Sequence, residues 1–206
     1  MEKQKQGEKR SSKAKIMDAA ARLFVQKGYH GTSVATIAHA TGLTAGALYR
    51  HFKSKEDLLL ALIRKFDVDY LDRLAEELDA KRDDSLGALR RFLLFAVRFA
   101  GRDPDLAILL AIVSAEFQGI KGKIGEELTR VYSKYARVIR RIIEDGKREN
   151  QFDQNLDTHS LAYMIIGLME GAFLKFQHNR GILDSDDFLR TFQQVLLQGL
   201  KPVKPQ

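Results

Sequence analysis

The sequence of 206 residues contains no cysteine, which excludes disulfide bonds, thiol nucleophiles and cysteine-ligated zinc and fits a reducing cytoplasm. It has only three prolines, so almost nothing interrupts helices inside the fold. The longest apolar run, Leu161–Phe176, contains Glu170 and Lys175 and is too short to span a bilayer about 30 Å thick. Because the opening segment Met1–Lys15 is polar and basic, we expect no secretory signal and a cytoplasmic protein that does not enter a membrane.

Signatures of catalysis are missing as well. Five histidines are scattered along the chain, and none forms a metal-like pair with an acid three or four residues further on. No G-x-S-x-G motif, phosphate-binding loop or dinucleotide fingerprint occurs. We therefore expect no enzyme, no cofactor and no metal site.

Positive charge is present, but only at one end. The net charge is +7, and Met1–Lys55 alone holds 11 basic residues against 3 acidic ones, a balance of +8 that leaves −1 for the rest. A uniformly basic protein could merely be well solvated, whereas one basic end is better explained by a polyanionic partner.

Helical periodicity dominates the sequence, and no sustained alternation of period two appears, which predicts an all-α fold of about nine helices. The predicted helices cover Ser11–Lys27, Val34–Ala40, Thr44–His51, a long stretch from Ser54 to Lys81, Leu86–Gly101, Asp103–Gln118, Lys123–Asn150, Leu156–Arg180 and Ser185–Leu200. We expect a three-helix head with a basic arm over residues 1–55, a helical body over 56–200, and a tail over 201–206.

The two short helices in the basic quarter form a helix-turn-helix pattern, with Gly42 supplying the positive φ of the turn. Their apolar residues should pack against the first helix; these are Ile37, Ala38 and Leu48, facing Leu23 and Phe24. The outer face of the second short helix then carries Thr44, Ala45, Gly46, Tyr49 and Arg50. Small residues there allow the helix to enter a DNA major groove, and an arginine can pair with guanine. The alternative is a plain helical hairpin with a solvated polar face.

The stretch from Gly28 to Leu58 resembles the signature of the TetR family of regulators. It contains G-Y-x-x-T-S, G-x-L-Y-x-H-F and K-E-x-L, and the I-A-x-x-A-G element departs mildly, with Thr41-Gly42 where Ala-Gly is commoner. The rest of the chain resembles the family only in the number and length of its helices. The resemblance implies a DNA-binding head and a dimerising, ligand-sensing body.

Carried over to this sequence, the resemblance implies DNA contacts of two kinds. Those to phosphates come from Thr32 or Ser33, Tyr49, His51 and Lys55, and those to base edges from Thr44, Ala45, Gly46, Tyr49 or Arg50. Free N–H groups at helix starts favour phosphates in the same places. His51 could instead orient the helix junction. The arm, with Lys3, Lys5, Lys9, Arg10, Lys13 and Lys15, either follows the DNA or is a solvated tail.

The helix around Leu161–Leu174 is apolar nearly all round, so it must bury two faces. One face can meet an identical helix, and Gly167 and Gly171 would allow close approach. The predicted interface consists of Gly167, Gly171, Leu174, Phe188, Phe192, Val195 and Leu196, in a homodimer that reads a palindromic operator. The alternative is a central helix of a monomer.

Aromatic residues cluster in the body, where the resemblance implies an apolar effector pocket and the alternative is ordinary core packing. Two acids on apolar stripes, Glu116 and Glu170, need partners because burying an unpaired carboxylate is costly. The candidate effector-binding residues are Phe66, Tyr70, Phe95, Phe99, Val113, Phe117, Tyr135, Ile166, Glu170 and Phe173. An acyl chain or a flat drug-like molecule would suit them. We predict a repressor released from its operator by such a ligand, the alternative being an architectural DNA-binding protein without an effector.

Overall fold

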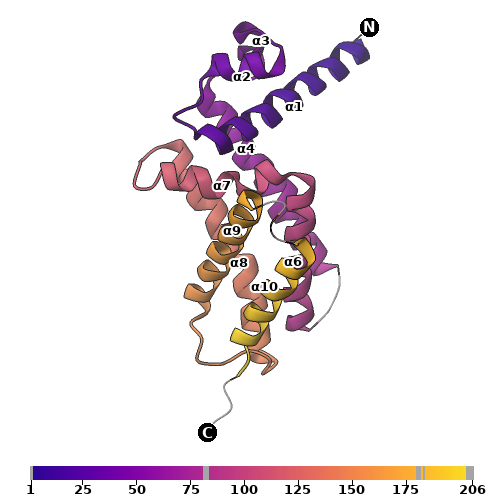
Figure 1. The fold of residues 1–206 in the computed structure, drawn as a ribbon, viewed down its shortest axis with the longest axis vertical. Coiled ribbons are helices and arrows are strands. Elements are labelled where there is room, and N and C mark those ends of the chain that lie inside the picture. The colour runs from indigo at the N-terminus through magenta and orange to yellow at the C-terminus, as the bar shows by residue number, and fades with distance from the viewer. Residues whose placement is uncertain (1, 81–83, 180–181, 183, 203–206) are drawn as a thin grey trace. The chain divides into compact units, whose positions relative to one another are not determined.

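The computed structural model describes residues 2–80, 84–179, 182 and 184–202, and all regular secondary structure within them is helical (Figure 1). The elements are α1 (Glu2–Lys27), α2 (Val34–Thr41), α3 (Ala45–Tyr49), α4 (Lys55–Phe66), η1 (Asp67–Asp72), α5 (Arg73–Asp79), α6 (Ser85–Arg102), α7 (Pro104–Glu116), α8 (Lys123–Arg148), α9 (Thr158–His178) and α10 (Ser185–Gly199). Because α4, η1 and α5 follow without a break, they form the long helix predicted from Ser54. The all-α prediction is confirmed. Over the described ranges, no helix is apolar for long enough to cross a membrane.

The chain divides into two compact units. The first comprises Met1–Asp67 and Asp103–Arg130, and the second comprises Val68–Arg102 and Val131–Gln206. This division differs from the boundary expected at residue 55, because α4 and α7 pack with α1 in the first unit. The predicted head therefore shares its unit with a segment that the sequence assigned to the body.

The core of the first unit forms where α1, α2 and α3 meet. Ile16, Ala20 and Phe24 recur every four residues along α1 and are fully buried, so they form one apolar stripe. The residues predicted to pack behind the helix-turn-helix are all buried; these are Leu23, Phe24, Ile37, Ala38 and Leu48.

The short helices begin and end at the residues whose chemistry predicts it. Ser33 caps α2 by accepting a hydrogen bond from the N–H of Thr36, and Thr44 caps α3 in the same way through Ala47. Gly42 ends α2 at φ +68°, a conformation that glycine adopts without strain. At the start of α4, Ser54 accepts from Asp57, whose carboxylate accepts from the N–H of Lys53.

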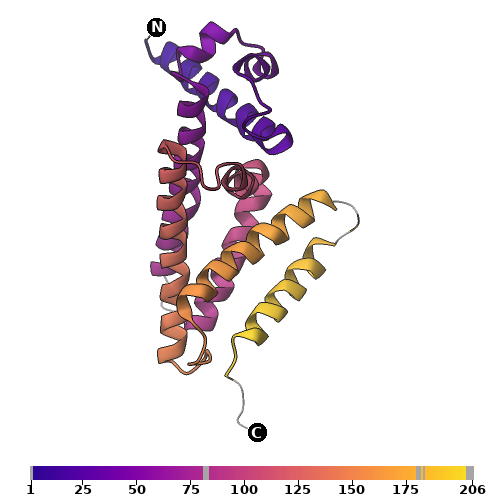
Figure 2. The same cartoon turned by 90° about the vertical axis from the view of Figure 1, so that its left-hand side faces the viewer.

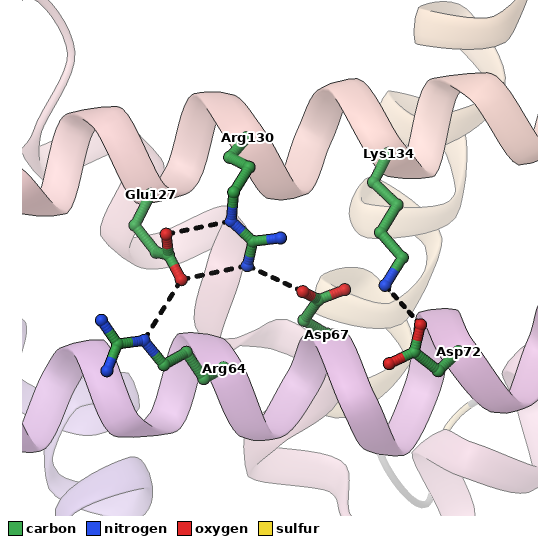
Figure 3. A network of polar contacts seen from close by, with 6 residues as sticks. All are labelled: Arg64, Asp67, Asp72, Glu127, Arg130 and Lys134. Carbon is green, nitrogen blue, oxygen red and sulfur yellow. Dashed lines mark hydrogen bonds and ion pairs between the residues drawn. The ribbon is translucent and has the colours of Figure 1, made fainter.

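An ion-pair network joins α4, η1 and α8 within the first unit (Figure 3). The guanidinium of Arg130 donates two hydrogen bonds to Glu127 and a third, of 2.7 Å, to Asp67. Glu127 also accepts from Arg64 at 3.4 Å. The hydrogen bonds from Arg130 hold the pKa of Glu127 below its usual range.

The long helix contains a π-helical turn, η1, which the apolar periodicity does not predict. Asp67 and Asp72, its first and last residues, pair with Arg130 and Lys134 of α8, each pair within its own unit. In an α-helix, residues five apart point about 140° away from each other. The wider π turn brings them toward one face, so the two ion pairs favour the π turn over a regular helix.

The second unit is built from η1 after Asp67, from α5 and α6, from α8 after Arg130, and from α9 and α10. Leu89, Phe92 and Leu93 on α6 and Ile139 and Ile143 on α8 are fully buried in its core. Helices α9 and α10 lie side by side, as Figure 2 shows, and the rings of Phe176 and Phe188 meet at 5.6 Å.

Candidate nucleic-acid interface and effector site

The outer face of α3 is exposed along its whole length. Thr44, Ala45, Gly46 and Arg50 are exposed, and Tyr49 keeps 51% of its surface accessible, although a large aromatic residue is usually buried. On the opposite side of the same helix Leu48 is completely buried. The helix is therefore fixed from behind while its small and hydrogen-bonding residues face outward together, as predicted.

Among the residues that the structure describes, none crowds Gly46 closely enough to require a glycine. A Cβ added there would lie 4.0 Å from the hydroxyl oxygen of Thr44 and would meet nothing closer. Glycine in a helix costs about 0.5–1 kcal/mol relative to alanine. A constraint from outside the chain, such as the close approach of a DNA groove, would account for a glycine at this exposed position.

At the start of α2 the two candidate phosphate ligands differ in accessibility. Thr32 is buried, and its hydroxyl donates to the carbonyls of Gly28 (2.7 Å) and Leu23 (3.2 Å). Ser33 is exposed at the N-cap. Of the two residues that the resemblance offered, only Ser33 is accessible.

Lys55 is not directed outward as a phosphate ligand would be. Its ammonium donates to the carbonyls of Tyr29 and Thr32, each at 2.8 Å, and lies 4.1 Å from the centre of the Tyr29 ring. Burial lowers the pKa of Lys55, against a raising influence from Glu116. Two of its three N–H donors are therefore engaged within the head, and a direct contact of Lys55 with DNA stays a prediction.

The remaining basic candidates lie along the edge of the head. His51 is half-buried just after α3. Helix α1 begins at Glu2 rather than at Ser11, so the predicted arm is the first part of a helix. Lys13 and Lys15 are exposed, with the Lys13 ammonium 5.5 Å from the Phe52 ring, while the arm's other basic side chains lie outside the part described.

Glu116 finds its partners in the head. Its two carboxylate oxygens accept hydrogen bonds from the N–H groups of Tyr29 (2.7 Å) and His30 (3.1 Å). The neighbouring ring of Phe117 meets the rings of the same two residues at 5.2 and 5.5 Å. Phe117 therefore packs against the head, and its assignment to the effector site stays a prediction.

An aromatic cluster with paired hydroxyl groups lies inside the second unit. The ring of Tyr70 meets those of Phe95, Phe99 and Tyr135 at 4.9 to 5.6 Å. The hydroxyls of Tyr70 and Tyr135 are 2.8 Å apart, and burial raises the pKa of both phenols. Four predicted effector residues thus come together, whereas Phe66 and Val113 are buried in the first unit.

Glu170 lies in the same unit, on α9, with a phenol as its partner. It accepts a 2.6 Å hydrogen bond from Tyr132, a residue missing from the predicted set. Burial raises the pKa of the Glu170 carboxyl, and the Tyr132 bond opposes that rise. Of the other predicted residues on α9, Ile166 is buried and Phe173 half-buried.

One face of α9 is apolar and exposed. Met164 is 61% exposed and Leu168 50%, beside Gly167 and Gly171, where an added Cβ would meet nothing within 4 Å. On α10, Val195 is 69% exposed. The sequence pattern identified the two glycines and Val195 but missed Met164 and Leu168, because α9 is apolar all round.

The other predicted interface residues are more enclosed. Leu174, Phe188 and Phe192 are half-buried. Leu196 is only 7% exposed, which corrects its assignment to the interface, because its side chain packs within its own chain.

Comparisons with known proteins agree with this geometry. Residues 16–62 match the family model of bacterial regulatory proteins, tetR family, and residues 108–192 match that of a tetracyclin repressor-like C-terminal domain. The fatty acid metabolism regulator protein of Bacillus subtilis (strain 168) is 24% identical over 197 residues, which are 94% of this chain and 97% of that protein.

Two solved structures are similar over nearly their whole length. The MbdR regulator from Azoarcus sp. CIB superposes with a TM-score of 0.83 at 25% identity, covering 92% of this chain and 98% of that one. The transcriptional regulator FadR from Bacillus subtilis in complex with stearoyl-CoA shares the fold, with a TM-score of 0.73 at 22% identity over 91% and 98% of the two chains. The chain belongs to the tetR family of bacterial regulatory proteins, and it is a DNA-binding, ligand-responsive transcriptional regulator.

Proposed function

We propose that the protein is a homodimeric repressor whose two α3 helices read the halves of a palindromic operator and whose effector is an acyl thioester bound in the second unit. The DNA-binding part of this proposal rests on the exposed face of α3, where the space beside Gly46 is open. Thr44, Tyr49 and Arg50 supply the side-chain donors on that face. Arg50 can pair with both acceptors of a guanine, while Ser33 and the start of α2 fix the register on phosphates.

The homodimer is supported by the exposed face of α9. Met164, Gly167 and Leu168 expose apolar surface on a helix, and no described residue comes within 4 Å of a Cβ added at Gly167 or Gly171. Burying such a face against a second copy removes apolar surface from water and lets the two helices approach closely. A twofold dimer presents two recognition helices to two inverted half-sites.

The effector class follows from the polar groups of the second unit. Tyr70 and Tyr135 provide two phenol hydroxyl groups among aromatic rings. Glu170 is an acid whose pKa is raised by burial. A free fatty acid would place its carboxylate near another buried acid, which like charges disfavour. A neutral thioester carbonyl could accept a hydrogen bond from a phenol instead. The fatty acid regulator and the stearoyl-CoA complex among the similar proteins support the same class.

The test compares palmitoyl-CoA with palmitate as releasing agents for an operator duplex bound by the purified protein. We expect palmitoyl-CoA to release the duplex and palmitate to fail at the same concentration. In the Glu170→Gln variant palmitate should gain activity, because the opposing charge is gone. Release by neither compound, or equal release by both from the unaltered protein, would contradict the thioester assignment.

Two other functions lead to different results. An architectural protein would bind DNA with little sequence preference, and no small molecule would release it. An enzyme would convert the released thioester, so recovery of intact palmitoyl-CoA after release is expected for a regulator.

A further inference from the structure

The turn between α1 and α2 is held by charged side chains from two other helices of the same unit. Glu116, at the end of α7, accepts from the N–H groups of Tyr29 and His30. Lys55, at the start of α4, donates to the carbonyls of Tyr29 and Thr32. Glu116 and Lys55 thus bind the N–H and the carbonyl of the same residue, Tyr29.

The turn is shaped to receive the carboxylate. Gly28 has φ +73°, where residues with a side chain are strained, and a Cβ there would lie 2.9 Å from Oε1 of Glu116. Tyr29 is buried, with its ring against Phe24 and Phe117, and its carbonyl also accepts from the N–H of Thr32 at 3.2 Å, so the turn is held from several sides. Hydrogen bonds to charged groups are about twice as strong as those between neutral groups, so Glu116 fixes this turn firmly.

The turn also determines where the helix-turn-helix begins. Thr32 closes it with a hydroxyl bonded to Gly28, and the next residue, Ser33, caps α2. Helix α2 packs on α3, so a displaced turn would move the recognition helix with it.

We propose that Glu116 is a positioning residue for operator binding, which holds the helix-turn-helix in its reading orientation through the main chain of Tyr29 and His30. The proposal rests on the assignment of α3 as the operator-reading helix. It gives a carboxylate outside the helix-turn-helix a specific share in DNA recognition.

Two explanations predict opposite effects of removing Glu116 on operator affinity: one in which only its charge matters, and one in which it positions the head. Removing a negative charge from a DNA-binding unit should strengthen binding to any DNA. If Glu116 positions the head, its removal should instead weaken binding to the operator and leave binding to random DNA unchanged or slightly stronger. The ratio of the two affinities therefore separates the explanations.

The experiment measures operator and random-duplex affinity for the full chain and for Glu116→Gln, with Glu126→Gln as the matched control. Glu126 is an exposed acid in the same unit, so its variant changes the charge equally. We expect Glu116→Gln to lose about tenfold in operator affinity, the size of one hydrogen bond to a charged group. The dependence of binding on salt should be unchanged, since Glu116 does not touch phosphates. Equal affinity ratios in Glu116→Gln and the control would overturn the proposal.

Two further variants keep the result interpretable if Glu116→Gln lowers the stability of the head. Glu116→Asp keeps the charge but shortens the reach, so it should lose operator affinity as Glu116→Gln does. Lys55→Gln should show the same loss, and the double variant should lose less than the sum, because both side chains act on Tyr29. Normal operator binding by Glu116→Asp would refute the proposal, and so would strictly additive affinity losses in the double variant. If the unaltered chain prefers no DNA sequence, the operator-reading function itself is refuted instead.

Discussion

Each of the two units holds one acid that the sequence places on an apolar stripe, and the two acids are satisfied in different ways. Glu116, in the unit with the helix-turn-helix, binds two main-chain N–H groups. Glu170, in the other unit, binds one phenol and has a raised pKa. The first acid orders a turn through two main-chain hydrogen bonds, while the second is held where burial makes its charge unfavourable.

The contacts of Glu116 indicate a structural role in the turn, whereas the raised pKa of Glu170 indicates a functional role for that acid. Glu116 accepts from two main-chain N–H groups and so satisfies donors that the turn leaves outside a helix. An acid with a raised pKa lowers stability at neutral pH, and such a group is often retained for a function. The comparison predicts that substitutions in the first unit change DNA recognition, while those in the second change assembly and effector response.

The largest effect is expected where a charge is placed on the exposed face of α9. Gly167→Glu should bury an unpaired carboxylate in each copy on dimerisation, at a cost of about 3 kcal/mol or more. Sedimentation should then show monomers, and operator affinity should fall by more than about a hundredfold because the half-sites are bound separately. Thr129→Glu, at an exposed position of α8, is the control. A dimer of normal strength in Gly167→Glu would exclude this face as the interface.

Arg50→Ala tests the recognition face of the first unit. The loss of a bidentate contact to guanine should weaken operator binding by about 1–3 kcal/mol and relax the preference at one base pair of each half-site. Titrations with operator and random duplexes measure both effects. If neither affinity changes, Arg50 does not belong to the reading face.

Gly46→Ala should change stability and function in opposite directions. Space around Gly46 is open, so alanine should stabilise α3 by up to about 1 kcal/mol. The added methyl group should hinder entry of the helix into the groove and weaken operator binding. Thermal unfolding and operator titration of the same preparation check this prediction, and improved binding would contradict it.

Glu170→Gln should give a small, pH-dependent rise in melting temperature. Because the folded-state pKa of Glu170 lies above its ordinary value of 4.5, the ionised form reduces stability above that folded-state pKa. The variant should therefore be more stable than the unaltered protein at neutral pH, with a difference that shrinks as the pH falls toward 4.5. Melting curves across this range test the sign, with Glu126→Gln as the exposed control.

The head was predictable because its signals are local. Cap residues such as Ser33 and Thr44, and the glycine at position 42, each act within a few residues of their own position. The main-chain contacts of Lys55 were not predictable, because only the tertiary fold brings the carbonyls of Tyr29 and Thr32 to its ammonium.

The body was less predictable because its features depend on partners distant in the sequence. The π turn of η1 is associated with ion pairs to α8 about sixty residues away, so periodicity could not reveal it. The exposed strip with Met164 and Leu168 was hidden because both faces of α9 are apolar. The partner of Glu170 was hidden as well, since Tyr132 lies on another helix.

The central claim is that the protein reads a palindrome as a dimer. The most direct measurement is the selection of bound duplexes from a random pool at about physiological salt, where non-specific binding is weakened. We predict that one palindromic sequence with two inverted half-sites will be recovered, and that Arg50→Ala will lose the preference at a fixed position in both halves. Recovery of no preferred sequence, or of a single half-site without symmetry, would contradict the claim.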